Sequence, residues 1–176
     1  MLGYYKAAGQ TDEAFTSDGW LRTGDKGALD EAGSLRIVGR VKDLFKTSKG
    51  KYVTPAPIED RLVMHEAIEA CCVTGANLGQ PIALAMLSAA LSERFADPAE
   101  RAALESSLAS HLRDINATLD PHEQLDCLVL VPEQWTVENG IVTPTFKVKR
   151  NRIEEIYARN FESWAGRRQA VIWHEG

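Results

Sequence analysis

Apolar residues along the chain gather into runs of two kinds, one continuous and one helically spaced. Three continuous runs, at residues 68–74, 82–90 and 125–131, have the length and composition of buried β-strands. Polar segments that contain glycine or proline separate them. We therefore predict three strands that form the centre of a small sheet.

Helical spacing marks three further segments. The longest spans residues 97–119; it begins with the capping pair Asp97-Pro98 and ends before Pro121. Its apolar side chains recur every three or four residues, at Leu104, Leu108, Leu112, Ile115 and Leu119. Shorter helices are predicted after Thr54, with Ile58, Leu62 and His65 on one face, and near the end of the chain, with Ile153, Ile156, Tyr157 and Phe161.

The first 39 residues contain only short strand patterns. Residues 20–22 and 35–38 are predicted strands, and the Asp-Glu-Ala-Gly run at 30–33 is the turn between them. Two or three short strands are not stable alone. We therefore expect residues 1–39 to be the terminal β segment of a larger domain, and residues 40–176 to be a separate small domain.

The order of the predicted elements defines a fold class. After the hairpin come helix, strand, strand, helix, strand, loop and helix, an order typical of α+β or mixed α/β folds. The fold that we expect is a small three-stranded sheet flanked by helices and preceded by a β-hairpin region.

Charge is unevenly placed along the chain. The net formal charge is −5, which argues against nucleic acid as the main partner. Residues 40–52 nevertheless carry five basic residues against one acidic residue, and residues 144–152 carry four basic residues and no acidic one. Two compact cationic segments on an acidic chain favour a phosphate-bearing small molecule as ligand.

The three cysteines, Cys71, Cys72 and Cys127, fall inside predicted strands. Their spacing fits neither a disulfide framework nor a zinc site, so we predict reduced core residues and no metal site. The sequence has no apolar run of about 18 residues and does not begin with a signal-peptide pattern. We therefore expect a cytoplasmic location, with peripheral contact to the inner membrane face as an open alternative.

Three motifs carry the candidate chemistry. They are Gly-Trp-Leu-Arg-Thr-Gly-Asp at residues 19–25, Gly-Arg-Val-Lys-Asp at 39–43 followed by Lys46, and Thr-Pro-Thr-Phe-Lys at 143–147. The two glycines of the first motif are spaced as in a phosphate-binding loop, but Asp25 stands where that loop requires lysine. A carboxylate at this position would repel phosphate, so we reject a phosphate loop here.

In this order, the three motifs resemble those of the adenylate-forming enzymes. The form Thr-Pro-Thr-x-Lys-x-Lys-Arg of the third motif is similar to that of the long-chain acyl-CoA synthetase branch. The resemblance covers essentially the whole chain. It implies the small C-terminal domain of such an enzyme, together with the last hairpin of the large domain that carries the phosphate loop and the acyl pocket.

The resemblance implies roles for residues of the first two motifs. Asp25 would accept hydrogen bonds from the ribose hydroxyls of the nucleotide, and Arg40 would lie near the same ribose. Lys42 corresponds to the hinge, whose backbone absorbs a rotation of the small domain.

The loop that follows resembles the segment that helps to form the family's tunnel for the pantetheine arm of coenzyme A. Its candidate residues are Lys46, Ser48, Lys49 and Gly50. Which of them would contact the thiol path is left open, as is the alternative of a charged hairpin tip with no ligand.

Lys147 corresponds to the family's catalytic lysine, which places a positive charge near the α-phosphate of ATP during adenylate formation. Most members have glycine before this lysine, whereas Phe146 stands here. A register that places Lys149 in the role stays open, and the basic patch could also be a solvated face or a contact with anionic membrane.

The implied reaction joins a fatty acid to coenzyme A through an acyl-adenylate, consuming ATP and releasing AMP and pyrophosphate, with Mg²⁺ bound by the absent large domain. The chain alone is expected to be inactive and to need that domain as its partner. A different carboxylic acid substrate and a non-catalytic lid that acts in trans are the alternatives. We also expect self-association through exposed strand edges and apolar residues such as Phe15 and Trp20.

Overall fold

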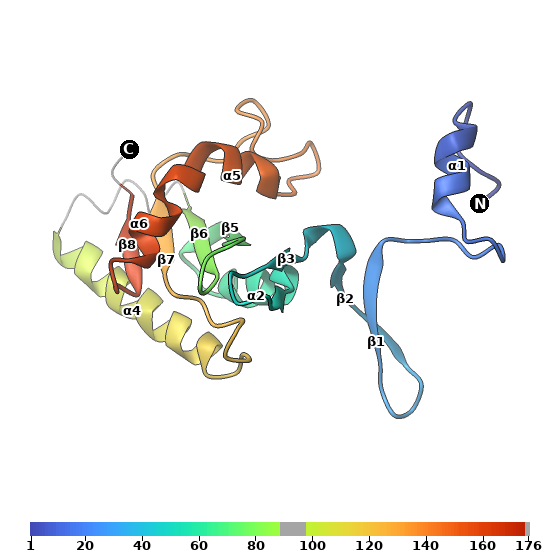
Figure 1. Cartoon of the computed structure of the whole chain (residues 1–176). Coiled ribbons are helices and arrows are strands. Elements are labelled where there is room, and N and C mark those ends of the chain that lie inside the picture. The colour runs from blue at the N-terminus through green and yellow to red at the C-terminus, as the bar shows by residue number, and fades with distance from the viewer. Residues whose placement is uncertain (89–97, 175–176) are drawn as a thin grey trace. The chain divides into compact units, whose positions relative to one another are not determined.

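The structure, a computed structural model, describes residues 1–88 and 98–174 and divides into two compact units, Met1–Asp43 and Leu44–Gly176 (Figure 1). Ala89, Ala90 and Asp97, which belong to the predicted second strand and long helix, lie outside the described residues. Among the described helices, none has the length and hydropathy needed to span a bilayer.

The first unit is a β-hairpin preceded by a short helix. Its elements are α1 (Ala8–Ala14), β1 (Asp25–Leu29), β2 (Leu35–Arg40) and a 3₁₀ turn, η1 (Val41–Asp43). The two strands pair antiparallel, and Gly33, with φ of +80°, lies in the turn predicted between them. A hairpin region therefore precedes the second unit, as predicted.

The predicted first strand of this hairpin, residues 20–22, is wrong. Leu21 forms only an isolated bridge with Phe15, and the pairing with β2 begins at Asp25. Gly24, with φ of +75°, turns the backbone between these two segments. The apolar residues at 20–21 indicated a strand, whereas the true strand, Asp-Lys-Gly-Ala-Leu, is poor in strand-forming residues.

The centre of the second unit is a four-stranded sheet. Its strands, in spatial order, are β5 (Ile68–Thr74), β6 (Ile82–Leu87), β7 (Leu128–Val131) and β8 (Val171–Trp173). β5 and β6 are antiparallel, and β6–β7 and β7–β8 are parallel. The mixed α/β class is confirmed, and the three predicted strands are present. The fourth strand was not predicted, because a three-residue apolar run is too short to give a pattern.

Helices cover both faces of this sheet (Figure 1). α2 (Pro55–Leu62) and α4 (Pro98–Asn116) pack on one face, and α5 (Arg150–Tyr157) and α6 (Phe161–Ala165) pack on the other, with the 3₁₀ turn η3 (Ala158–Asn160) between the latter two. The predicted stripes are buried on α2 and α4, but both helices end earlier than predicted, so His65 and Leu119 follow them.

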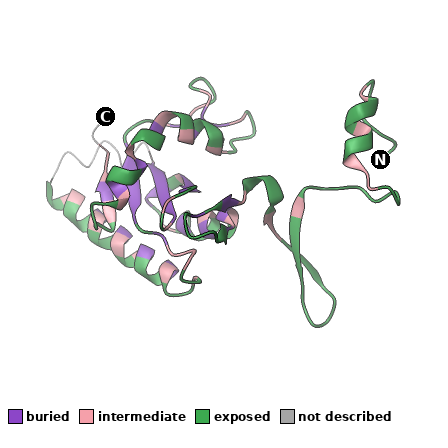
Figure 2. Cartoon of the chain, in the orientation of Figure 1, coloured by how far each residue is buried: buried purple, intermediate pink, exposed green. Residues whose placement is uncertain are grey.

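Alternate residues along the strands point to opposite faces of the sheet. Val73, Ala85 and Leu130 contribute to the cluster under α2 and α4, whereas their neighbours Cys72, Leu84 and Val129 contribute to the cluster under α5 and α6. All three cysteines are buried in these clusters or beside them, as predicted. Figure 2 shows that the buried residues gather in the sheet and on the inner faces of its helices.

A short antiparallel pair precedes α2. It consists of β3 (Phe45–Lys46) and β4 (Tyr52–Val53). Phe45 and Val53 point into the cluster under α2 and α4, while Lys46 and Tyr52 are exposed. This pair therefore fixes the base of the turn that contains the predicted coenzyme A residues.

Candidate functional site

Lys147 lies at the tip of a tight hairpin whose base is a bridge between Val142 and Val148. Thr143 holds the tip together: its backbone N donates to Lys147 O at 2.9 Å, and its Oγ1 accepts from Lys147 N at 3.1 Å. Phe146 has φ of +58° and exposes 82% of its surface. A residue with a side chain thus takes the left-handed conformation, which favours glycine, immediately before Lys147.

The Lys147 side chain is exposed to solvent. Across residues 1–88 and 98–174, no carboxylate forms an ion pair with it. Lys149 is also exposed, but it lies at the base of the hairpin, where its backbone N donates to Ile141 O at 2.8 Å immediately before α5. The two lysines therefore differ in position: Lys147 directly follows the 143–146 turn, whereas Lys149 directly precedes α5.

Arg150, the first residue of α5, anchors the hairpin to the sheet. Its Nη2 is 2.6 Å from Glu59 Oε1 on α2, and its Nε donates to Val73 O on β5 at 2.9 Å. The same glutamate oxygen accepts from Val73 N at 2.8 Å. The pair is mostly buried, with side-chain exposures of 18% and 22%. This anchor could not be predicted from local patterns, because its partners are 91 residues apart in the sequence.

The second cationic segment, residues 144–152, is therefore less charged than its composition indicated. Arg150 is neutralised by Glu59, and Arg152 pairs with Glu155 at 2.8 Å. Both glutamates lie outside the segment, so counting charges within it could not reveal them. Lys147 and Lys149 supply the charge that remains exposed.

The predicted coenzyme A residues form one compact turn. Thr47 N donates to Lys51 O at 2.9 Å, and Gly50 adopts φ of +78°. Lys46 Nζ lies 5.7 Å from the centre of the Tyr52 ring, and Lys49 Nζ contacts Gln80 Oε1 at 3.3 Å. The turn thus places Lys46 over an aromatic ring and hydrogen-bonds Lys49 to a glutamine.

The loop between β5 and β6 supports this turn from beneath. Ser48 N donates to Leu78 O at 2.9 Å, and Asn77 N donates to Lys46 O at 3.0 Å. Gln80 then reaches on to the carbonyl oxygens of Pro121 and Gln124. These contacts hold the backbone of the turn in place while its lysine side chains stay at the surface.

Asp25 and Arg40 meet in the first unit. They are partners in the β1–β2 register, and Asp25 Oδ1 is 2.9 Å from Arg40 Nε. Arg40 Nη1 also donates to Thr23 O at 3.4 Å. The guanidinium thus orients the carboxylate. Lys42 follows in η1 and is exposed.

The candidate residues form three local groups. Asp25, Arg40 and Lys42 belong to the first unit, whereas the turn at 46–51 and the hairpin at 142–148 belong to the second. Within the described residues of the second unit, no hydrogen bond or ion pair joins the turn to the hairpin. The described residues also contain no group of three or more metal-binding side chains.

Comparison with known proteins identifies the class. Residues 42–165 match the family model of the AMP-binding enzyme C-terminal domain. The chain is 34% identical to a peroxisomal long chain acyl-CoA synthetase 6 of Arabidopsis thaliana, over 90% of its own length and 24% of the relative's. It is 33% identical to the long-chain-fatty-acid–CoA ligase FadD15 of Mycobacterium tuberculosis, over 92% of its length and 29% of the relative's.

Solved structures agree with this assignment. The adenylation domain of a Mycobacterium chelonae carboxylate reductase matches 93% of the chain with a TM-score of 0.78 at 25% identity, using 26% of its own length. An adenylation–carrier didomain of the Segniliparus rugosus carboxylic acid reductase, in complex with AMP, matches 92% of the chain and 23% of its own length, with a TM-score of 0.76 at 25% identity.

The chain therefore belongs to the AMP-binding enzyme C-terminal domain family. It spans about a quarter of the length of the curated relatives that it matches.

Proposed function

We propose that this chain serves as the mobile C-terminal domain of a long-chain fatty acid–CoA ligase. The overall reaction converts fatty acid, ATP and coenzyme A into acyl-CoA, AMP and pyrophosphate by way of an acyl-adenylate. The observation that carries the proposal is Lys147, an exposed lysine without an ion-pair partner among the described residues, at the tip of a tight hairpin in a chain similar to such ligases.

Lys147 supplies positive charge for the first half-reaction. Attack of the carboxylate on the α-phosphate of ATP concentrates negative charge on the phosphoryl oxygens, which a nearby ammonium group stabilises. An ammonium that already formed an ion pair within its own domain would contribute less. The hydrogen bonds between Thr143 and Lys147 limit the backbone freedom of the tip.

The turn at residues 46–51 serves the second half-reaction, in which the thiol of coenzyme A attacks the acyl-adenylate. Gly50, at φ of +78°, allows close approach of the backbone to a narrow ligand such as the pantetheine arm. Lys46 and Lys49 place positive charge beside that path, where it would attract the phosphates of coenzyme A.

The first unit contributes nucleotide contacts and the pivot. Asp25, oriented by Arg40, accepts the ribose hydroxyls, and Lys42 is the position about which the second unit rotates between the two half-reactions. ATP is used with Mg²⁺, and no residue of this chain is assigned to the metal.

A chimera tests the proposal. The chain replaces the matching segment of the Mycobacterium tuberculosis relative, and each half-reaction is measured separately: fatty-acid-dependent ATP–pyrophosphate exchange, and acyl-CoA formation from supplied acyl-adenylate. Lys147→Ala is expected to lower the exchange rate about 10²–10³-fold while largely sparing thioester formation, because its charge is used only in the first half. Lys149→Ala is the matched control and is expected to retain most exchange activity.

Two results would contradict the assignment. Equal loss of both half-reactions in Lys147→Ala would show a structural rather than an electrostatic role. A chimera with the unsubstituted chain that performs neither half-reaction would show that the chain does not act as the ligase lid.

A further inference from the structure

A cavity of about 550 Å³ lies in the second unit, on the side of the sheet edge formed by β8. Its walls come from α4, from η3 and α6, and from β8 together with the residues on either side of it. None of the lining residues belongs to the turn at 46–51 or to the hairpin at 142–148. The cavity is therefore separate from the groups to which the proposed ligase chemistry is assigned.

One wall of the cavity is aromatic and fixed. The Trp164 indole is 2% exposed, and the His174 ring meets it edge-on with centroids 5.2 Å apart. Tyr157 contacts His174 from a second direction, at 5.6 Å, and His174 N donates to Leu130 O at 2.9 Å. These contacts give the cavity a preformed wall.

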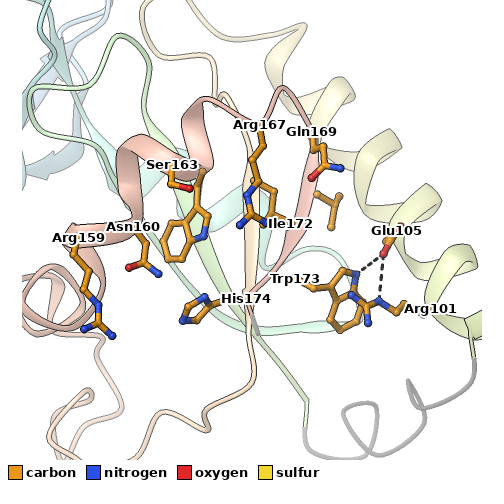
Figure 3. A pocket seen from close by; sticks show the side chains of 12 residues that line it. Arg101, Glu105, Arg159, Asn160, Ser163, Arg167, Gln169, Ile172, Trp173 and His174 are labelled. Atoms are coloured by element: carbon orange, nitrogen blue, oxygen red, sulfur yellow. Dashed lines mark hydrogen bonds and ion pairs between the residues drawn. The ribbon is translucent and has the colours of Figure 1, made fainter. Parts of the chain in front are cut away.

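The acidic group of the cavity is already engaged. Glu105 Oε1 accepts from Trp173 Nε1 and lies 3.5 Å from Arg101 Nε, and the Arg101 guanidinium stacks over the Trp173 ring at 4.4 Å. Figure 3 shows this group on one side of the cavity, with Arg159, Asn160 and Ser163 on the other and His174 between them. Glu105 is the one carboxylate among the described lining residues.

Two arginines remain to give the cavity its charge. Arg159 and Arg167 are exposed, and in the described part of the chain neither forms an ion pair or a side-chain hydrogen bond with a carboxylate. The Asn160 and Gln169 amides and the Ser163 hydroxyl add neutral hydrogen-bond donors around them. Guanidinium forks with neutral donors beside them are the groups that bind tetrahedral oxyanions.

We propose that this cavity binds a small phosphate-bearing molecule, with Arg159 and Arg167 as its charged ligands. The concave shape and the aromatic wall favour a single small molecule over a flat anionic surface. The site goes beyond the proposed ligase function, because it uses none of the residues assigned to either half-reaction.

Titration of the full 176-residue chain with inorganic phosphate tests the site, with ionic strength held constant by sodium chloride. Saturable binding is expected in the unsubstituted chain. Arg167→Gln and Arg159→Gln should each weaken the affinity about tenfold, as expected for loss of a charged hydrogen-bond donor. Arg168→Gln is the matched control: this neighbouring arginine is exposed but does not line the cavity, so its affinity should match that of the unsubstituted chain.

Three results would overturn the proposal. They are non-saturable binding, unchanged affinity in both Arg159→Gln and Arg167→Gln, and a loss of affinity in Arg168→Gln equal to theirs.

Phosphatidylcholine vesicles containing phosphatidic acid form a second arm of the experiment. Capture of the chain by these vesicles without binding of free phosphate would assign the arginines to a lipid surface instead. Circular dichroism melting curves that coincide among the variants establish that the substitutions leave the fold intact.

Discussion

A single guanidinium, that of Arg150, joins three segments of the second unit. It bonds to a carboxylate on α2 and a carbonyl on β5 while starting α5, and it is largely buried. Removing one partner of such a pair leaves the other charge desolvated and unpaired, which costs more than the pair itself contributes.

Glu59→Gln is therefore expected to lower the free energy of unfolding by roughly 2–4 kcal/mol, because about a fifth of each side chain still reaches solvent. Urea denaturation followed by circular dichroism measures the change. Glu155→Gln is the control: it breaks the exposed Arg152–Glu155 pair and should cost less than about 1 kcal/mol. Similar losses in the two variants would show that burial adds nothing to the Arg150 contact.

The cysteines predict a dependence on alkaline pH. Burial raises the pKa of Cys72 from its ordinary value of 9.0 to about 12, and burial likewise raises the pKa of Cys127 to about 12. The contribution of these buried thiols to the stability of the fold is therefore fully present below pH 9.0. It is lost as the pH rises toward 12, because only the unfolded chain forms thiolates in that range.

Two measurements check this prediction. The folded chain should react slowly with a thiol reagent at pH 8, and should react fully in urea. The urea midpoint should fall above pH 9, less steeply in Cys72→Ala. Rapid reaction of all three thiols in the folded chain would contradict the burial of these side chains.

At the scale of elements, two histidines join the end of α2 to α4. His65 Nδ1 accepts from Ala67 N at 3.2 Å, which leaves Nε2 to donate to Ser107 Oγ at 3.0 Å. The His65 and His111 rings lie 5.3 Å apart. Burial lowers the pKa of His65, the charge of His111 lowers it further, and Glu66 opposes them.

The sign of the pH effect follows from this lowered pKa. The contribution of His65 to stability is present above pH 6.5 and is lost as the pH falls through the lower folded value. NMR titration should give His65 a midpoint below 6.5. His111→Gln should raise that midpoint and Glu66→Gln should lower it, so a midpoint insensitive to both would contradict the assigned neighbours.

Long elements with regular patterns were predictable, and short elements fixed by partners were not. The leucine stripe of α4 identified a helix, because burial of one helix face produces helical spacing of apolar residues. The apolar run of β5 identified a strand, because burial on both faces produces a continuous run. β1 and β8 are too short or too polar to show a recognisable pattern, and their strand conformation depends on pairing with the neighbouring strands.

The candidate site also contains parts that the sequence indicated and parts that it did not. Lys147 and the Lys46–Gly50 segment were singled out by motifs that are local in sequence, and their roles stay predictions. The Glu59–Arg150 anchor and the cavity at β8 could not be predicted, because tertiary contacts between distant segments create them.

At the scale of the whole molecule, the two units differ in how they are stabilised. No residue of Met1–Asp43 is buried, and Trp20, Leu29 and Ile37 expose more than half of their surface. The second unit contains the four-stranded sheet and both hydrophobic clusters. Its stability should thus be independent of the first unit.

Deletion of residues 1–43 tests this expectation. The shortened chain should unfold cooperatively with a urea midpoint close to that of the full chain, because every core residue of the described structure is retained. It should also be monomeric by light scattering, whereas the full chain should self-associate through its exposed apolar residues. Association of both chains, or of neither, would show that the first unit is not its cause.

The Arg150 anchor also limits how Lys147, the proposed catalytic lysine, can move. Because α5 is bonded to α2 and to β5, the edge strand of the sheet, the hairpin cannot move independently of the second unit. Under the proposed function, Lys147 would therefore reach and leave the nucleotide only through rotation of the whole second unit, and stiffening the backbone near Lys42 should slow the exchange between the two proposed half-reactions without altering the hairpin.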